Sequence, residues 1–380
     1  MKRIIQFKYR VLVLLIEILT ILLLLLLAYN FVSMPTKKTT FYLEESNTTS
    51  ILKTLNKLGY KTYPIDKYVL GLMHGLMPGW YSLEGEKEGR FSFFKNLHLK
   101  KVDTMQVKLY AGETSIELTK RLANDMKLDP IKLLNIYKEK SLFSEADIFE
   151  GRYIIARNAD ENTTMNYLFE TSNKIFEQFS KYNCKKTLST LDLKILLIIA
   201  SIIQKESNLA KEMPLISSVI YNRLEKNMKL QMDGTLNYGK YAHTIVTPER
   251  IKTDESYFNT YKYKGLPPAP LSTISVEALK AAYYPAKSDY LFFMLNKDGS
   301  HNFAATYKEH LANIRSFKAK KKRKKEKKNT SEKKKIKKPN IVKSKRENNT
   351  TITTEVKKIE INISKENILL EKKSQNSQIQ

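Results

Sequence analysis

A long apolar segment near the N-terminus constrains this chain more than any other feature. Residues 11–32 are apolar, interrupted chiefly by Glu17, Thr20 and Asn30, and residues 22–27 are all leucine. A helix of about 20 apolar residues spans the hydrocarbon core of a bilayer. We therefore predict a single transmembrane anchor over residues 11–32. Glu17 lies near its N-terminal end, where a carboxylate is tolerated.

The charges that precede this segment predict its orientation. Residues 1–10 contain four basic side chains, those of Lys2, Arg3, Lys8 and Arg10. The positive-inside rule places such a flank in the cytoplasm. No small-residue cleavage site follows the apolar run, so we expect an uncleaved anchor and not a removed signal peptide. Everything after Ser33 is then extracytoplasmic.

The last sixth of the chain differs from the rest in composition. The formal net charge is +27, and over half of it comes from residues 318–380. This lysine-rich segment has too few apolar residues to bury a core, so we predict a disordered basic tail. Lysine runs also bind nucleic acid without specificity, but the predicted topology places the tail outside the cytoplasm. We therefore expect no nucleic-acid partner. The single cysteine, Cys184, excludes an internal disulfide.

Between the anchor and the tail, residues 40–155 have the pattern of a small α+β domain. Strand patterns cover residues 40–43 and 105–110, and helical apolar spacing covers residues 47–58 and 116–126. The second strand is followed by a turn, residues 111–115, and then by a helix. This order resembles a LysM repeat, a βααβ module that binds aminosugar glycans. The resemblance implies a glycan-binding domain over residues 40–155.

Residues 156–317 predict a second domain of mixed α/β type. A helical stretch over residues 163–182 leads into it. Local signals then predict three helices. The first begins at Ser189 or Thr190 as its N-cap, the second covers 215–226 with Pro214 in its first turn, and the third begins at Ser275 as its N-cap. Strands 290–295 and 301–304, joined by the turn 296–299, are predicted to form a hairpin.

Glu206 lies at the end of an almost wholly apolar segment, residues 195–207. At 100° per residue it shares a helical stripe with Ile195, Ile199 and Ile202, so it points toward packed interior or a pocket. Apolar surroundings and the negative end of a helix both raise the pKa of a carboxyl group. Such a protonated acid suits acid catalysis on a glycosidic oxygen. A structural glutamate paired with Lys or Arg is the alternative.

An ordered series of motifs resembles the MltG/YceG family of membrane-anchored endolytic murein transglycosylases. The resemblance covers roughly residues 10–317 and leaves the basic tail out. The motifs are ASIIQKES (200–207), PLISSVIYNRL (214–224), LQMDGT (230–235) with Tyr238-Gly239, YFNTY (257–261), GLPP (265–268), LKAA (279–282) with Pro285-Ala286, and GSHNF (299–303) with His310.

This resemblance implies a lyase that cuts the β-1,4 bond between N-acetylmuramic acid and N-acetylglucosamine within nascent glycan strands and leaves a 1,6-anhydro-muramoyl end. Most glycosidases need two carboxylates. A lytic transglycosylase manages with one, because the C6 hydroxyl of the substrate attacks C1. Glu206 occupies the family's catalytic position and is expected to be the general acid/base, in an enzyme of cell-wall assembly that limits strand elongation. The alternative is an inactive, membrane-anchored peptidoglycan-binding protein.

The resemblance also implies residues that contact the sugar strand. These are Ser207, Tyr221, Asn222, Arg223, Gln231, Asp233 and Tyr238. For Arg223 a structural tie between helix and loop is the alternative, and for Tyr238 a place in the core. Asp233 is the best candidate for a second carboxylate, and its proximity to Glu206 would permit hydrolysis.

Two departures from the family pattern stand out. The usual Asp-Pro-Thr of the loop is Asp233-Gly234-Thr235 here, and the interdomain stretch 150–157 has drifted. The five histidines form no i, i+4 pair, and no P-loop or Rossmann glycine pattern occurs, so we expect neither metal nor cofactor. A structural role is expected for His301 and His310.

The expected location is the cytoplasmic (inner) membrane, crossed once, with the catalytic domain in the periplasm or its extracytoplasmic equivalent. The expected partners are peptidoglycan strands and peptidoglycan synthases. For the tail we expect an acidic surface, either phospholipid or the carboxylates of peptide stems. A solubilising extension without a partner is the alternative.

Overall fold

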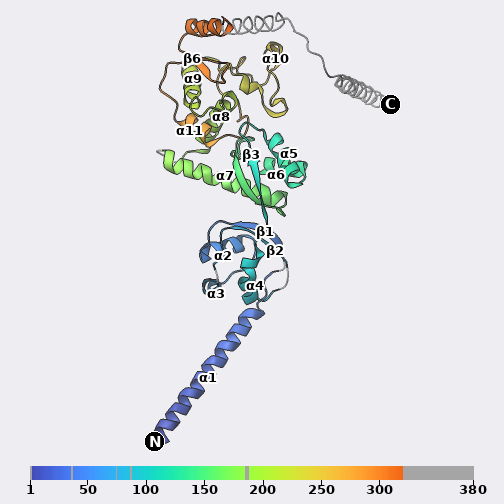
Figure 1. The fold of residues 1–380 in the computed structure, drawn as a ribbon, viewed down its shortest axis with the longest axis vertical. Coiled ribbons are helices and arrows are strands. Elements are labelled where there is room, and N and C mark those ends of the chain that lie inside the picture. The colour runs from blue at the N-terminus through green and yellow to red at the C-terminus, as the bar shows by residue number, and fades with distance from the viewer. Residues whose placement is uncertain (1, 36, 74, 86–87, 185–187, 320–380) are drawn as a thin grey trace, which may run out of the picture. The chain divides into compact units, whose positions relative to one another are not determined.

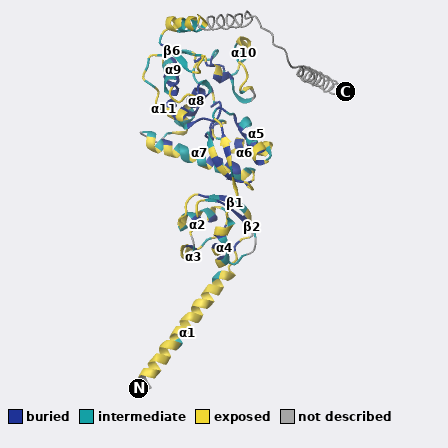
Figure 2. Ribbon diagram, viewed as in Figure 1, coloured by how far each residue is buried: buried dark blue, intermediate teal, exposed yellow. Residues whose placement is uncertain are grey.

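The computed structural model describes residues 2–35, 37–73, 75–85, 88–184 and 188–319 (Figure 1). It begins with α1 (Lys2–Phe31), whose 30 residues correspond to about 45 Å of helix. Residues Ile4–Phe31 are long and apolar enough to cross a membrane, and the leucines on this helix are exposed (Figure 2). The anchor helix thus begins earlier than predicted and ends one residue sooner.

Two βααβ modules follow the anchor. The first consists of β1 (Lys38–Leu43), α2 (Thr48–Lys57), α3 (Pro64–Leu72) and β2 (Gly79–Glu84). The second consists of β3 (Thr104–Leu109), α5 (Ser115–Met126), α6 (Pro130–Lys140) and β4 (Gly151–Ala156). In each module the two strands pair antiparallel, with Lys38 opposite Glu84 and Thr104 opposite Ala156. The βααβ order of the LysM resemblance is present, and it occurs twice, whereas the domain bounds 40–155 stay a prediction.

Each module has a hydrophobic cluster, and Trp80 of β2 belongs to the cluster of the second. Leu55, Tyr60 and Phe94 belong to the cluster of the first, together with residues of α4 (Arg90–Asn96) and the short 3-10 helix η1 (Leu97–Lys100). Leu118 and Leu133 belong to the cluster of the second. In the first module, buried Arg90 donates through Nε to Oδ1 of buried Asp66 over 2.7 Å. Buried charges of this kind need such a partner.

The long helix α7 (Glu161–Asn183) belongs to two clusters. Met165 and Leu168 pack into the cluster of the second module, and Phe179 packs into a third cluster built around α8 (Thr190–Glu206). This third cluster also includes residues of α9 (Met213–Glu225) and α11 (Val276–Tyr283). The remaining elements are the 3-10 helices η2 (Asp233–Leu236) and η3 (Gly239–Tyr241), α10 (Pro248–Thr253), β5 (Phe292–Leu295) and β6 (His301–Ala304).

The local signals of the second domain mostly gave the correct elements. Ser189 caps α8 in a reciprocal pair with Asp192, which decides between the two predicted N-caps. Ser275 caps α11, and β5 and β6 form the predicted antiparallel hairpin. Residues 307–319 are helical, so this helix crosses the predicted start of the tail at 318. Residues 320–380 lie outside the described part of the chain, and the predicted disorder of the tail stays a prediction.

Candidate active site

Glu206 is the last residue of α8, and the two to three turns of the helix before it are buried on nearly every side. Residues Leu196–Gln204 are all buried, including Ile199 and Ile202 on the predicted stripe. Ile195, one turn into the helix, is 38% exposed. The stripe is therefore buried in the two turns before Glu206. Packing on all sides holds the end of the helix in one position.

The surroundings of Glu206 favour its protonated form. The pKa of its carboxyl group is raised from 4.5 to about 7, chiefly by burial and also by the charge of nearby Asp233, although a hydrogen bond from Gly234 lowers it. That bond runs from the backbone N–H of Gly234 to Oε1 over 3.1 Å. No lysine or arginine among the described residues is an ion-pair partner of Glu206. Among the described residues, Glu206 therefore lacks the cation that would neutralise a structural glutamate.

The preceding residue, Lys205, is held away from Glu206 by the second module. Its Nζ donates to the carbonyl oxygen of Gly112 over 2.6 Å, and burial lowers its pKa. Thr273 anchors the same turn, because its N–H donates to Glu113 O over 2.7 Å and its O accepts from Gly112 over 2.9 Å. The second module thus supports the end of α8 directly.

Gly234 lies so close to α8 that a side chain does not fit. A Cβ there would be 2.7 Å from the Cβ of Lys205 and 3.0 Å from Oε1 of Glu206. The loop is fixed behind this contact by Thr235 and Thr260, whose hydroxyls lie 2.9 Å apart and are buried. Glycine is thus required for the close approach that lets the 234 amide reach the carboxylate.

Glu206 lines a cavity of about 320 Å³. Of the residues predicted from the sequence, the structure gathers Glu206, Arg223, Gln231 and Asp233 on its wall. The other lining residues are Leu230, Met232, Tyr261, Phe293, Met294, Leu295 and His301.

Asp233 is held by a residue that sequence reasoning did not select as a site residue. The hydroxyl of Tyr261 donates to Oδ1 of Asp233 over 2.6 Å. Burial raises the pKa of Tyr261 well above its usual range, and the hydrogen bond to Asp233 adds to the rise. Tyr261 belongs to the YFNTY motif, which was the available signal, but spacing alone did not connect it to Asp233.

Arg223 is buried, and its guanidinium donates hydrogen bonds to backbone carbonyls. Its Nε donates to Leu291 O over 2.6 Å, and its Nη1 donates to Leu230 O over 2.7 Å and to Lys229 O over 3.0 Å. Burial lowers its pKa. The guanidinium thus ties α9 to the loop before Gln231 and to the segment before β5, as the structural alternative supposed. It also remains on the cavity wall.

His301, expected to be structural, lies on the cavity wall with a buried carboxylate behind it. Oε2 of Glu212 is 2.8 Å from Nδ1 of His301, and Oε1 accepts from the backbone N–H of His301 over 3.1 Å. Both side chains are buried. These contacts join the start of β6 to the N-terminus of α9, and the ring contacts Phe293 edge-on.

Four predicted substrate residues do not line this cavity. Tyr221 donates to Ala282 O over 2.9 Å, and Asn222 donates to Ser288 O and Tyr290 O. The hydroxyl of Ser207 accepts from Leu209 N–H, and Tyr238 stacks on Phe258 with ring centroids 4.2 Å apart. Their contact with substrate stays a prediction.

The described residues contain no group of three His, Cys, Asp or Glu side chains placed to hold a metal ion. On the cavity wall, Glu206 has one carboxylate neighbour, Asp233.

Comparison with known proteins gives three kinds of match. The sequence model of a family described as "YceG-like family" matches residues 43–316. An endolytic murein transglycosylase of Bacillus subtilis (strain 168) is 36% identical over 131 residues, which is 34% of this chain and 36% of the relative. One of Streptococcus pneumoniae serotype 2 (strain D39 / NCTC 7466) is 30% identical over 177 residues, 45% of this chain and 31% of the relative. The match thus spans about a third of each relative's length.

A crystal structure of a YceG-like protein from Listeria monocytogenes is also similar. It has 25% sequence identity and a TM-score of 0.45, and the match covers 73% of this chain and 99% of that one.

Proposed function

The chain belongs to the YceG-like family, and we propose that it is an endolytic peptidoglycan transglycosylase with Glu206 as its general acid/base. The observation that carries the proposal is the half-buried carboxyl of Glu206, which lines a cavity and whose pKa is raised to about 7. The names of the matched relatives support the same substrate class. Their matched segments include only about a third of each protein, so the activity of the whole chain is inferred here.

The proposed reaction needs one proton donor. Protonated Glu206 gives its proton to the glycosidic oxygen between N-acetylmuramic acid and N-acetylglucosamine as the C1–O bond breaks. The C6 hydroxyl of the same muramic acid attacks C1, and the carboxylate of Glu206 takes the proton of that hydroxyl. The products are a 1,6-anhydro-muramoyl end and a free C4 hydroxyl, and Glu206 is protonated again.

Asp233 has an electrostatic role in this proposal. Its negative charge beside Glu206 favours the protonated acid before the reaction. The hydrogen bond from Tyr261 holds that carboxylate in place. Arg223 and Gln231, on the same wall, are the proposed contacts for the lactyl or acetamido groups of the strand.

Asp233 also keeps a second candidate reaction open. A glycoside hydrolase uses two carboxyl groups. One is the acid, and the second carboxylate activates water or attacks C1. That reaction would release reducing ends. The third possibility is an inactive peptidoglycan-binding protein, which would release no product.

The proposed location is the cytoplasmic (inner) membrane. Residues 1–10 are placed in the cytoplasm and the cavity of Glu206 on the outer side, where nascent glycan is found. The domain boundaries at 155 and 317, glycan binding by the LysM-like modules, contacts with synthases and attachment of the basic tail to an acidic surface belong to the same proposal. A C-terminal reporter that works only in the cytoplasm would contradict this topology.

The test is digestion of purified glycan strands by the full chain and by Glu206→Gln. The proposal expects anhydro-muramoyl ends from the wild type and at least about a thousandfold fewer from the variant, a loss typical of removing a catalytic acid. Identical product profiles would contradict it.

A further inference from the structure

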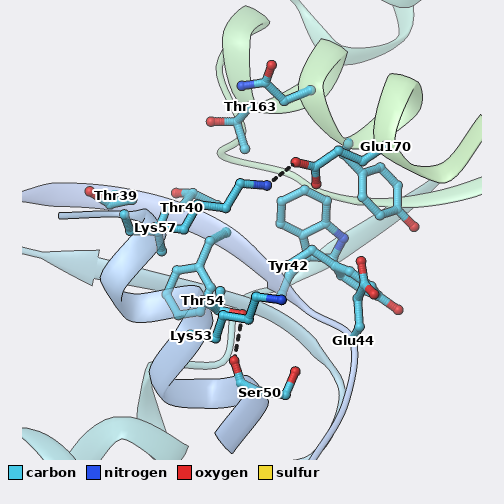
Figure 3. Close-up of a pocket in the computed structure, with 15 residues that line it drawn as sticks. Thr39, Thr40, Tyr42, Glu44, Ser50, Lys53, Thr54, Lys57, Thr163 and Glu170 are labelled. Carbon is cyan, nitrogen blue, oxygen red and sulfur yellow. Dashed lines mark hydrogen bonds and ion pairs between the residues drawn. The ribbon is translucent and has the colours of Figure 1, made fainter. Parts of the chain in front are cut away.

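A second cavity, of about 480 Å³, lies where the first module meets α7 (Figure 3). It shares no lining residue with the Glu206 cavity. Its walls come from β1, from α2, from Trp80 of β2 and from the N-terminal half of α7. We call it the Tyr42 cavity, after the aromatic residue of β1 that lines it.

Three aromatic rings meet in the wall of the Tyr42 cavity. The ring centroids of Tyr42 and Trp80 are 5.5 Å apart, those of Tyr42 and Tyr167 5.0 Å, and those of Trp80 and Tyr167 4.9 Å. Trp80 is buried and its Nε1 donates to Ile154 O over 2.7 Å, so its polar atom is already satisfied. Tyr42 and Tyr167 are only half-buried, so parts of both rings remain available to a ligand.

Some polar side chains of the same cavity can still form hydrogen bonds with a ligand. Lys53, Thr163 and Asn166 line it, and within the described residues their side chains have no hydrogen-bond or ion-pair partner. Lys57 of α2 reaches Glu170 of α7 over 2.6 Å, and Figure 3 shows this pair linking the two helices. A ligand in the cavity would therefore find free donors and acceptors beside an aromatic surface.

We propose that the Tyr42 cavity binds a neutral sugar unit of a glycan strand. Aromatic surface with a few polar groups suits a ring that has apolar C–H faces and hydroxyl or amide edges. The charged lining residues are two lysines, Lys53 and Lys57, and two glutamates, Glu44 and Glu170, so the lining has no excess charge to attract a phosphate. The choice of a glycan rests on the proposed function, whose substrate is such a strand.

The helix α7 connects this cavity to the catalytic core. Its N-terminal half lines the cavity, and Phe179 near its other end packs into the cluster around α8. A strand long enough to occupy both cavities gains affinity, because the second contact is intramolecular once the first has formed. The enzyme should therefore prefer long strands to short fragments.

The experiment measures binding of peptide-free glycan strands, fractionated by length, to the full chain in detergent. All proteins carry Glu206→Gln, so that no strand is cut. The test variant adds Lys53→Ala and Asn166→Ala, which removes two exposed polar groups without opening the core. The matched control adds Asn162→Ala, an exposed position on α7 that does not line the cavity. A further variant, Thr163→Trp, fills the cavity.

The affinity for long strands should fall about tenfold in the test variant, as expected for two lost hydrogen bonds, and should fall likewise in Thr163→Trp. The control should bind like its parent, and short fragments should bind all four proteins alike. Equal binding of long strands by the test variant and the control would overturn the proposal. So would competition by free stem peptides but not by sugars, which would assign the cavity to peptide.

Failure of the proposed function has a different signature. If the chain with Glu206 intact produced no anhydro ends while the length-dependent affinity was still lost in the test variant, the catalytic proposal would fail and the Tyr42 cavity would remain a glycan site. Normal activity together with unchanged binding in the variants would overturn only the cavity.

Discussion

At Glu206, two influences favour the protonated carboxyl group and one opposes them. Burial and the charge of Asp233 raise its pKa, and the amide of Gly234 lowers it. The net value of about 7 leaves a comparable share of acid and carboxylate near neutral pH. In the proposed reaction Glu206 gives a proton and then takes one back, and a pKa near the working pH suits both steps.

The raised pKa predicts a stability cost that appears only at higher pH. Because the folded pKa of Glu206 is about 7 against 4.5 when unperturbed, its stabilising contribution is complete below pH 4.5 and is lost as the pH rises through 7. Glu206→Gln should therefore match the wild type near pH 4.5 and exceed it by up to about 3 kcal/mol near pH 8. Chemical denaturation across this range measures the difference.

Glu145 serves as an internal reference for that measurement. Burial raises its pKa to about 7 as well, so its titration affects both proteins equally and cancels in the difference. A constant difference between the two proteins from acid to alkaline pH would contradict the assigned pKa of Glu206.

Asp233 predicts a shift in the pH dependence of activity. Asp233→Asn removes a charge that raises the pKa of Glu206, so the alkaline limb of kcat/KM should move to lower pH. Tyr261→Phe removes the hydrogen bond to Asp233 but leaves both carboxylates, and its limb should stay in place. A limb that moves in Tyr261→Phe but not in Asp233→Asn would refute this role.

The sequence predicted those cavity residues that belong to short motifs. Glu206, Arg223, Gln231 and Asp233 were selected from short motifs, and all four line one cavity. Tyr261 and His301 were not selected as site residues, because their partners, Asp233 and Glu212, lie far away in the chain. Apolar periodicity gives no information on such contacts.

At the scale of elements, one buried guanidinium joins three segments. Arg223 of α9 binds the carbonyls of Lys229, Leu230 and Leu291, and so positions both the loop that leads to Gly234 and the segment before β5. The caps of α8 and α11 were predictable because an N-cap depends on adjacent residues. This cross-link was considered only as an alternative to substrate binding, because its carbonyl partner at Leu291 is remote in sequence.

Arg223→Met should loosen these segments together. The variant keeps a long apolar side chain but leaves three carbonyls without their donor, at a cost of about 3 kcal/mol. Amide hydrogen exchange should rise in α9 and in the loop 229–236 while α2 and α3 of the first module remain unchanged. Arg223→Lys keeps the charge but not the forked geometry, so its amide exchange should lie between those of the wild type and Arg223→Met. Wild-type exchange in Arg223→Met would contradict the cross-link.

At the scale of the whole molecule, three hydrophobic clusters follow an apolar helix. The sequence predicted the anchor, the α+β class and the LysM-like topology, because each depends on local pattern. It did not separate residues 40–155 into two clusters, and it did not show that α7 contributes to two of them. Those features depend on how buried faces meet in three dimensions, which periodicity leaves open.

In the proposed mechanism a single carboxylate, that of Glu206, cleaves the strand without water. Digestion of glycan strands by the full chain in water labelled with heavy oxygen tests it most directly. The wild type should give muramoyl ends that are anhydro-sugars without label, and Glu206→Gln should give at least about a thousandfold fewer of them. Reducing ends that carry the label would show hydrolysis and would contradict this mechanism.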